Sequence, residues 1–252
     1  MPVPVWVVAC ASLFTVRSAT PPELLPARTP FREISTLAAQ ALFQPQTQKD
    51  LAALSGALAS DLARKFSSGR AQDAQLVVAL DDTRDQYVGL CCICVEMLSP
   101  GAFSDRRARG AEAQQLEQRP LLSNLAVSAD YRRKGIAKRL CREAELIAKA
   151  WGYNEVLIKV ETGNTKARRL YEKLGYRKVA VDLQAERPCA SGGRVRYEPT
   201  TTIAMRKDLQ VPPIDTLVNS AAIVAGAIYV LSSPTRLSDT LSLIDSSLRT
   251  LF

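Results

Sequence analysis

The sequence of 252 residues contains no histidine. This absence excludes the Ser-His-Asp and Cys-His forms of nucleophilic catalysis, and it removes the commonest zinc ligand. The six cysteines do not provide a second Cys-x-x-Cys pair to match Cys91 and Cys94. We therefore interpret the cysteines as small buried hydrophobic residues of a reducing compartment, and we expect no metal site.

Aromatic residues are also scarce, at 6% of the chain. Sites for single-stranded nucleic acid stack bases on aromatic side chains, so this composition argues against a nucleic-acid partner. The net charge is nevertheless +8. Much of it is concentrated in one short segment without any acid, which contains Arg132, Arg133, Lys134, Lys138, Arg139 and Arg142. One compact basic patch favours a phosphate-bearing small molecule over a polymer.

Acidic residues are missing from the N-terminal segment, where Glu23 is the first. An apolar run over residues 3–14 is followed by Arg17, and such acid-poor beginnings resemble targeting leaders, here the signal-to-transit junction of proteins sent to secondary plastids. No basic residue precedes the apolar run, which argues against a leader. Residues 1–32 are therefore expected to be either a targeting leader or an arm or strand packed on the domain.

Hydrophobic periodicity predicts an alternating α/β domain over residues 33–208. Helices are expected at 33–43, 49–66, 134–151 and 164–174, and strands at 76–80, 87–98, 121–127, 155–160, 176–183 and 200–206. Residues 99–119 are polar and rich in charge, which indicates an insertion or a substrate-facing loop that sets specificity. Residues 185–199 contain two prolines and two glycines and are also expected to be a loop.

The C-terminal tail, residues 209–252, has a different composition. No charged residue lies between Asp215 and Arg236. A helix over residues 216–235 would be long enough for a hydrocarbon core of about 30 Å, although several polar residues dilute the signal. The tail is expected to be either a single membrane anchor or an apolar helix packed on the domain or on a partner.

The most informative segment is the junction that follows the strand at 121–127. There, Arg132-x-x-Gly135-x-Ala137 opens the basic helix. A strand–loop–helix junction directs several backbone N–H groups at one point, where the helix dipole also favours an anion. Cations at a helix N-terminus are normally unfavourable by roughly 0.3–1 kcal/mol each. Their accumulation here predicts a bound polyanion, and a pyrophosphate fits best.

Three motifs together resemble the GNAT N-acetyltransferases. They are Leu125-Ala-Val127, Tyr131-Arg-Arg-Lys-Gly-Ile-Ala137 and Asn164-x-x-Ala167-x-x-Leu170-Tyr171-x-x-Leu174-Gly175-Tyr176. The resemblance covers residues 87–181, somewhat over a third of the chain. The segments 122–127 and 150–153 are especially similar to plastid and cyanobacterial members, which implies a location in the chloroplast stroma or at the thylakoid membrane.

The resemblance implies a mixed, mostly antiparallel sheet with helices on both faces, and a splayed central pair of strands that holds acetyl-CoA. In that family the backbone of Leu125, Ala126 and Val127 pairs with the pantetheine arm. The pyrophosphate lies on the loop that here consists of Arg132, Arg133, Lys134, Gly135, Ile136 and Ala137. Gly135 would let the main chain approach the phosphates, because it has no Cβ. At position 137 this chain has an alanine where the family frequently has a glycine.

Two further residues receive roles from the resemblance. Asn164 would hold the acetyl-CoA arm, although capping of its own helix explains an asparagine equally well. Tyr171 would donate a proton to the departing thiolate. The alternative is that this tyrosine only packs in the core. A phenol near pKa 10 protonates a thiolate near 8.5 at a cost of about 2 kcal/mol, which permits a general acid.

The general base and the acceptor remain open at this point. Some family members have a glutamate on the strand that contains Ser123 and Asn124 here. In its absence, Glu96 and Glu161 are the candidates for a general base that acts through water. Each of them could equally be a carboxylate on the rim of the site. An α-amine loses its proton almost freely near pH 8, whereas a lysine costs about 3 kcal/mol. We therefore expect protein N-terminal amines, then lysines, as substrates, with a small arylalkylamine as an alternative.

A reading from another class is also compatible with the sequence. The uncharged tail and the missing glutamate motivate a second hypothesis. In it, the protein is a catalytically weak subunit with a structural or assembly role in a membrane complex, for example a complex of the thylakoid membrane. Membrane fractionation and the presence or absence of turnover distinguish the two readings.

Overall fold

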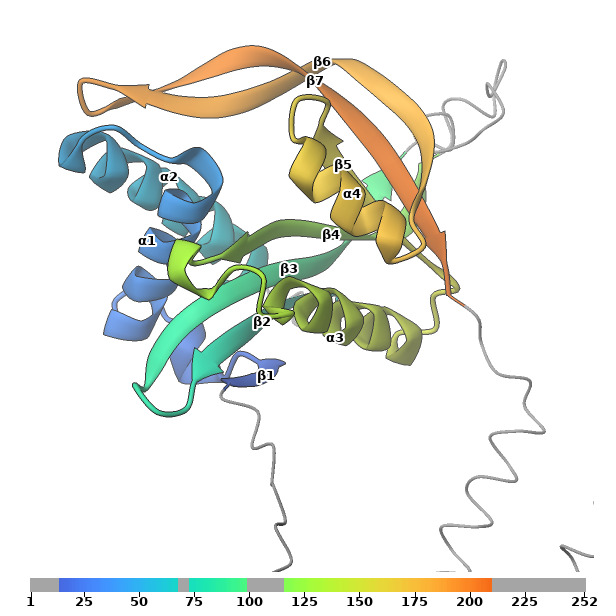
Figure 1. Ribbon diagram of the computed structural model, residues 1–252, viewed down its shortest axis with the longest axis horizontal. Coiled ribbons are helices and arrows are strands. Elements are labelled where there is room, and N and C mark those ends of the chain that lie inside the picture. Colours follow the sequence, from blue (N-terminus) through green and yellow to red (C-terminus); the bar gives the residue numbers. More distant parts are fainter. Residues whose placement is uncertain (1–13, 68–72, 99–115, 210–252) are drawn as a thin grey trace, which may run out of the picture. The chain divides into compact units, whose positions relative to one another are not determined.

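The structure is a computed structural model that describes residues 14–67, 73–98 and 116–209. In this part of the chain, one sheet has helices on both faces (Figure 1). The sheet has seven strands in the order β1-β2-β3-β4-β5-β7-β6. The strands are β1 (Phe14–Ser18), β2 (Ala74–Asp81), β3 (Gln86–Leu98), β4 (Glu117–Val127), β5 (Glu155–Glu161), β6 (Arg177–Ser191) and β7 (Arg194–Asp208). The helices are α1 (Thr29–Phe43), α2 (Gln48–Ser67), α3 (Ile136–Ala150) and α4 (Thr165–Lys173), with short 3-10 turns η1 (Pro21–Leu24) and η4 (Ala129–Tyr131).

Helix α3 covers one face of the sheet with the apolar stripe that its sequence predicts. Ile136, Leu140 and Ala144 are buried in a core that also contains α4 residues such as Tyr171. The helix lies close to β3 because residue 89 is a glycine. A Cβ there would meet the Ala126 carbonyl oxygen at 3.1 Å and the Ile136 and Leu140 side chains at 3.2 Å.

Helices α1 and α2 cover the opposite face. Phe31 and Ile34 of α1 and Leu62 of α2 are fully buried. They pack against β2 and β3 residues such as Leu76 and Leu90. The predicted apolar spacing of both helices is therefore confirmed.

Strands β4 and β5 form the parallel pair of the sheet, but they stay together only briefly. The pairing consists of Leu121 with Leu157 and Leu122 with Ile158. Beyond Leu122, β4 bulges against β3, with Asn124 at a φ of +54°. A bulge bends a strand and increases its twist. The two strands therefore separate, and the splayed central pair that the resemblance implies is confirmed.

Strands β6 and β7 form a long hairpin where a loop was expected at 185–199, so this expectation is wrong. The strands pair through Ser191 and Arg194. The turn uses Gly192 and Gly193 at φ values of +61° and +79°, as a two-residue hairpin turn requires. Pro188 is tolerated because β6 is an edge strand. The residues that indicated a loop are thus hairpin residues.

One strand boundary also differs from expectation. Residues 117–120 belong to β4 rather than to the preceding loop, and Pro120 pairs with Val95. Of the alternatives for the N-terminal segment, the strand is observed for Phe14–Ser18, which pairs antiparallel with β2.

Three of the sequence-based expectations concern residues outside the described ranges. These are the leader at 1–13, the main part of the loop at 99–115, and the tail from 210 onward with its expected span at 216–235. Among the helices that the structure does describe, none has the length and apolar character needed to cross a membrane.

Candidate active site

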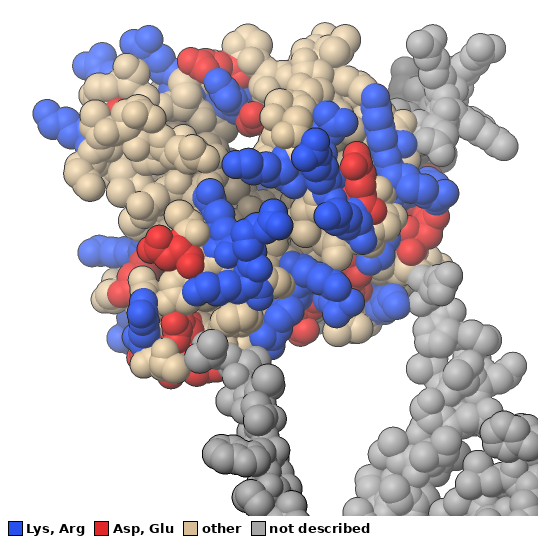
Figure 2. Space-filling model, in the orientation of Figure 1, with Lys and Arg blue, Asp and Glu red and all other residues tan. Residues whose placement is uncertain are grey.

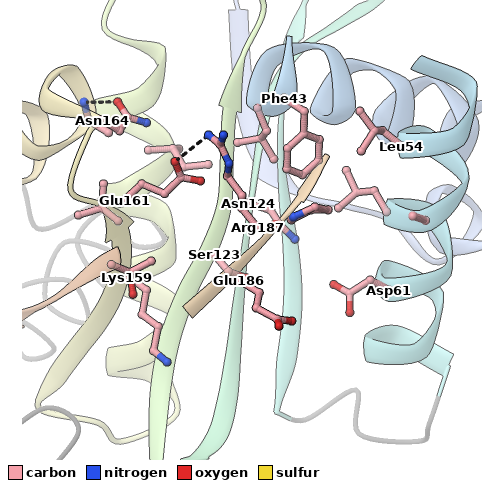
Figure 3. A pocket seen from close by; sticks show the side chains of 18 of the residues that line it. Phe43, Leu54, Asp61, Ser123, Asn124, Lys159, Glu161, Asn164, Glu186 and Arg187 are labelled. Carbon is pink, nitrogen blue, oxygen red and sulfur yellow. Dashed lines mark hydrogen bonds and ion pairs between the residues drawn. The ribbon is translucent and has the colours of Figure 1, made fainter. Parts of the chain in front are cut away.

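A cavity of about 940 Å³ lies where β4 and β5 separate (Figure 3). Tyr171 and Ala167 line it from α4, on one face of the sheet, and Leu58 and Asp61 line it from α2, on the other. The strand segments at its centre are Leu121–Leu125 of β4 and Lys159–Glu161 of β5. The cavity therefore connects the two faces of the sheet through the split.

The loop of residues 132–137, here called the coenzyme loop, leads from η4 into α3. Arg133 and Gly135 have φ values of +67° and +80°. The Arg132 N–H donates to the Ala129 carbonyl at 3.3 Å, and within the described ranges the next backbone N–H with an acceptor is that of Arg139, which donates to the Gly135 carbonyl at 3.1 Å. The N–H groups of residues 133–138 therefore stay free. Such a group of N–H donors at a helix N-terminus fits a phosphate.

Basic side chains surround this loop. Figure 2 shows Lys and Arg gathered over α3 and α4, and Arg132, Arg133, Lys134, Lys138 and Arg142 are exposed. Arg139 is different, since its guanidinium donates to the Phe14 carbonyl at 3.0 Å and lies 5.2 Å from the Phe14 ring. It holds β1 on the domain, so it is not one of the cations that are free for an anion.

The backbone of β4 offers a free edge beside the cavity. Ala126 and Val127 pair with Leu90 and Gly89 of β3 on one side. On the β5 side, no described strand pairs with β4 beyond Leu122. Leu125 lines the cavity. Such an edge can hydrogen-bond an extended arm in the way that it would bind another strand.

Asn164 caps its own helix and also lies at the cavity. Its side-chain oxygen accepts from the Ala167 N–H at 3.1 Å and so caps α4. The residue also lines the cavity, and within the described part of the chain its side-chain NH2 donates to no acceptor. The cap therefore uses the oxygen and leaves the amide donor for another partner.

Tyr171 lies deep in the cavity wall with 6% of its surface exposed. Its ring contacts that of Tyr176 edge to face, and among the described residues its hydroxyl has no hydrogen-bond partner. Burial raises the pKa of Tyr171 well above its usual 10. The phenol is therefore protonated at physiological pH and faces the site as a donor.

The opposite side of the cavity contains carboxylates that sequence reasoning did not single out. Asp61 of α2 and Glu186 of β6 point toward one another across it in Figure 3. Asp61 pairs with Arg64 at 2.7 Å. Glu186 lay in the expected loop, and the Gly192-Gly193 pair flanked by β-forming residues was the signal that could have revealed the hairpin.

The two candidates for the general base differ in their position relative to the cavity. Glu161 lines the cavity, and one of its carboxylate oxygens lies 3.7 Å from an Arg187 nitrogen. Glu96 accepts from the Cys94 thiol at 3.4 Å and is not among the described residues of the cavity wall. Of the two, Glu161 is thus the one that lies at the cavity.

Two hydroxyl groups at the split are also notable. Ser123 Oγ and Thr202 Oγ1 are buried in the cavity wall, and neither has a hydrogen-bond partner within the described ranges. Buried polar atoms nearly always have a partner in folded proteins. Thr202 lies directly opposite Glu161 in the β5–β7 pair. This part of the wall can therefore bind a polar group or water.

A sheet split at its centre, a cavity through the split and a helix start with free N–H groups are the features expected of an acyl-group transferase. The model of the "Acetyltransferase (GNAT) family" matches residues 38–176, more than half of the chain, and the chain belongs to this family.

The chain is also similar to three known proteins. It is 40% identical over 67 residues to GCN5-related N-acetyltransferase 4, chloroplastic, of Arabidopsis thaliana, covering 27% of this chain and 23% of that protein. It is 39% identical over 62 residues to N-acetyltransferase 8 of Homo sapiens, covering 25% and 27%. The matches thus span about a quarter of these curated relatives. In fold it is similar to Chaetomium thermophilum Naa20 solved with a bisubstrate analogue, with a TM-score of 0.51, 19% identity, and coverage of 77% of this chain and 86% of that one.

Proposed function

We propose that this protein transfers the acetyl group of acetyl-CoA to primary amines, above all to protein N-terminal α-amines and also to lysine side chains. One observation carries the proposal: a single cavity crosses the sheet at the β4–β5 split. A thioester held on the α3 and α4 face can there meet an amine that arrives from the α1 and α2 face. Direct transfer needs this meeting of the two reactants.

The residues at the split fit acetyl-CoA, which supplies an activated acetyl thioester. The coenzyme loop would bind the pyrophosphate through its free N–H groups, assisted by Arg132, Arg133 and Lys134. The unpaired edge of β4 beyond Leu122 would hold the pantetheine arm along Leu125, Ala126 and Val127. Asn164 would donate its free side-chain amide to the arm.

Catalysis would then use the groups at the centre of the cavity. The amine nitrogen bonds to the carbonyl carbon as the carbon–sulfur bond breaks, and Tyr171 gives its proton to the departing sulfur. Between a free phenol and a free thiol this proton transfer costs about 2 kcal/mol, and burial disfavours the phenolate and a neighbouring thiolate alike. A backbone N–H near the β4 bulge, of Val127 or a neighbour, would stabilise the negative charge on the carbonyl oxygen.

Glu161 would accept the proton that the amine loses, through a water held by the buried Thr202 and Ser123 hydroxyls. An α-amine is close to neutral near pH 8 and needs little help, whereas a lysine costs about 3 kcal/mol to deprotonate. This difference favours N-terminal amines as acceptors. The chloroplastic relative supports the further proposal that the protein acts in a plastid.

Isothermal titration with acetyl-CoA tests the coenzyme part of the proposal. Binding in the micromolar range is expected, and no binding at tens of micromolar would contradict it. Incubation with acetyl-CoA and a peptide library, read by mass spectrometry, then tests the acceptor. Acetylation of α-amines ahead of lysines is expected, and a panel of arylalkylamines tests the small-molecule alternative.

A further inference from the structure

The coenzyme loop is preceded by a buried tyrosine whose hydroxyl forms hydrogen bonds with residues outside the cavity wall. Tyr131 ends η4, immediately before Arg132, and 7% of its surface is exposed. Its hydroxyl donates to Asp81 Oδ2 at 2.6 Å. Asp81 ends β2, 50 residues earlier in the chain. The start of the coenzyme loop is thus joined to the turn between β2 and β3.

The Asp81 side chain is held in place by further hydrogen bonds. Its other oxygen accepts from the Thr83 N–H at 2.9 Å and from the Thr83 hydroxyl at 2.5 Å. These bonds, together with the one from Tyr131, lower the pKa of Asp81 to about 2. Arg84 in turn donates to the Tyr131 hydroxyl oxygen at 3.3 Å. The Tyr131 hydroxyl therefore has one acceptor and one donor, which fixes its orientation.

The coenzyme loop has little else to hold its shape. Its backbone is strained, because Arg133 has a φ of +67°, a conformation that costs a non-glycine residue roughly 1–2 kcal/mol. Its like charges repel one another at a helix N-terminus. Ile136, near the end of the loop, is buried in the core. For the exposed residues 132–135, the side-chain contacts within the described ranges are the bond from Arg132 Nε to the Val127 carbonyl at 3.3 Å and Lys134 over the Tyr131 ring at 4.6 Å. Tyr131 is the buried anchor next to these exposed residues.

We propose that Asp81 and Tyr131 are positioning residues that hold the coenzyme loop in its phosphate-binding shape before the coenzyme binds. The inference rests on the proposed use of acetyl-CoA. Neither residue lines the cavity, and the Tyr131 hydroxyl is directed at Asp81. A loop that is already shaped loses less conformational entropy on binding, so its affinity is higher.

Tyr131→Phe removes the hydroxyl and keeps the ring under Lys134. Titration calorimetry with acetyl-CoA should show affinity weakened roughly three- to ten-fold, the effect of one hydrogen bond. The same factor is expected for adenosine 3′-phosphate 5′-diphosphate, the nucleotide half of CoA, which contains no arm and no acetyl group. The KM for acetyl-CoA should rise by this factor while kcat at saturation stays unchanged.

Tyr87→Phe is the matched control, because Tyr87 donates to the Glu23 carboxylate in a second tyrosine–carboxylate pair away from the loop. Both variants should lose similar stability, but Tyr87→Phe should bind both ligands as the wild type does. Equal affinity of Tyr131→Phe and wild type would overturn the inference. So would an equal loss of affinity in the two tyrosine variants.

Asp81→Asn weakens the hydrogen bond between residues 81 and 131 without creating a cavity. It is the second test variant if Tyr131→Phe does not fold. It should weaken nucleotide binding in the same direction by a smaller factor, and unchanged binding would overturn the positioning role. A wild-type protein that binds neither ligand would refute the proposed function together with this inference. A wild-type protein that binds both, with variants that bind equally well, would refute the inference alone.

Discussion

Tyr171 and Tyr176 lie with their ring centroids 5.7 Å apart and their ring planes at 63°, yet their hydroxyls have different surroundings. The Tyr176 hydroxyl donates to Glu145 at 3.2 Å, and Glu145 also accepts from Lys207 at 2.6 Å. Tyr171 instead lines the cavity. One tyrosine of this contact pair is thus part of a buried polar network, and its neighbour is available to a substrate.

Tyr171→Phe should lower kcat about 10²-fold, because a general acid contributes at least this much when it is removed without replacement. Tyr176→Phe is the control for packing, and it should keep kcat while it loses about 1 kcal/mol of stability with its hydrogen bond. Steady-state kinetics and urea unfolding of both variants check this. An unchanged kcat in Tyr171→Phe would contradict the general-acid role and leave the fold assignment intact.

Gly135→Ala should weaken acetyl-CoA binding by more than its effect on stability explains. The new Cβ meets no protein atom within 4 Å, and residue 135 has a φ of +80°, so the substitution costs roughly 1–2 kcal/mol in strain and also blocks approach to the phosphates. Gly152 is a matched control at the other end of α3, with a φ of +88° and the same open space. Gly152→Ala should show the strain in its melting temperature and unchanged coenzyme affinity.

Glu161→Gln should reduce kcat for a lysine acceptor more than for an α-amine acceptor at neutral pH, because the lysine must lose its proton at a greater cost. Rates measured against pH for one peptide of each kind test this, and the loss should shrink as the pH rises toward the pKa of the amine. Glu96→Gln, outside the cavity wall, should leave both rates unchanged. Equal effects of Glu161→Gln on the two acceptors at every pH would exclude it as the base.

Acid should destabilise the N-terminal part of the sheet through Glu23. Burial acts to raise the pKa of this carboxyl, but hydrogen bonds from Arg17, Tyr87 and Thr20 outweigh it and lower the pKa to about 2. A depressed pKa means that the stabilisation is complete above the unfolded value near 4.5 and is lost as the pH falls toward 2. Urea midpoints from pH 7 to pH 2 should therefore converge for the wild type and Glu23→Gln, whereas the exposed Glu33→Gln should track the wild type throughout.

The local geometry of the proposed coenzyme side was predictable because it depends on residues that are near one another in sequence. Gly135 and the free helix start follow from a local turn, and the α3 stripe follows from a period of 3.6 residues. Tyr171 came with the family's motif. The structure shows its packing in the core, and the residue also lines the cavity, so its role as general acid stays a prediction.

The acceptor side was not predictable, because it depends on pairing between distant segments. Glu186 reaches the cavity only because β6 pairs with β7, and prolines and glycines in that region indicated a loop instead. Arg139 was counted among the phosphate-binding cations, but it contacts Phe14, 125 residues away. Local patterns carry no information on such contacts.

The tip of the β6–β7 hairpin is fastened to the first turn of α2, where the Gly193 N–H donates to Asp50 at 2.8 Å. Hairpin and helix residues both line the cavity, so the fastened tip forms a bridge over its acceptor side. A wide, flat protein surface cannot pass beneath such a bridge. Under the proposed function, an amine would instead enter on a slender extension, and both a free chain end and a long side chain meet this requirement.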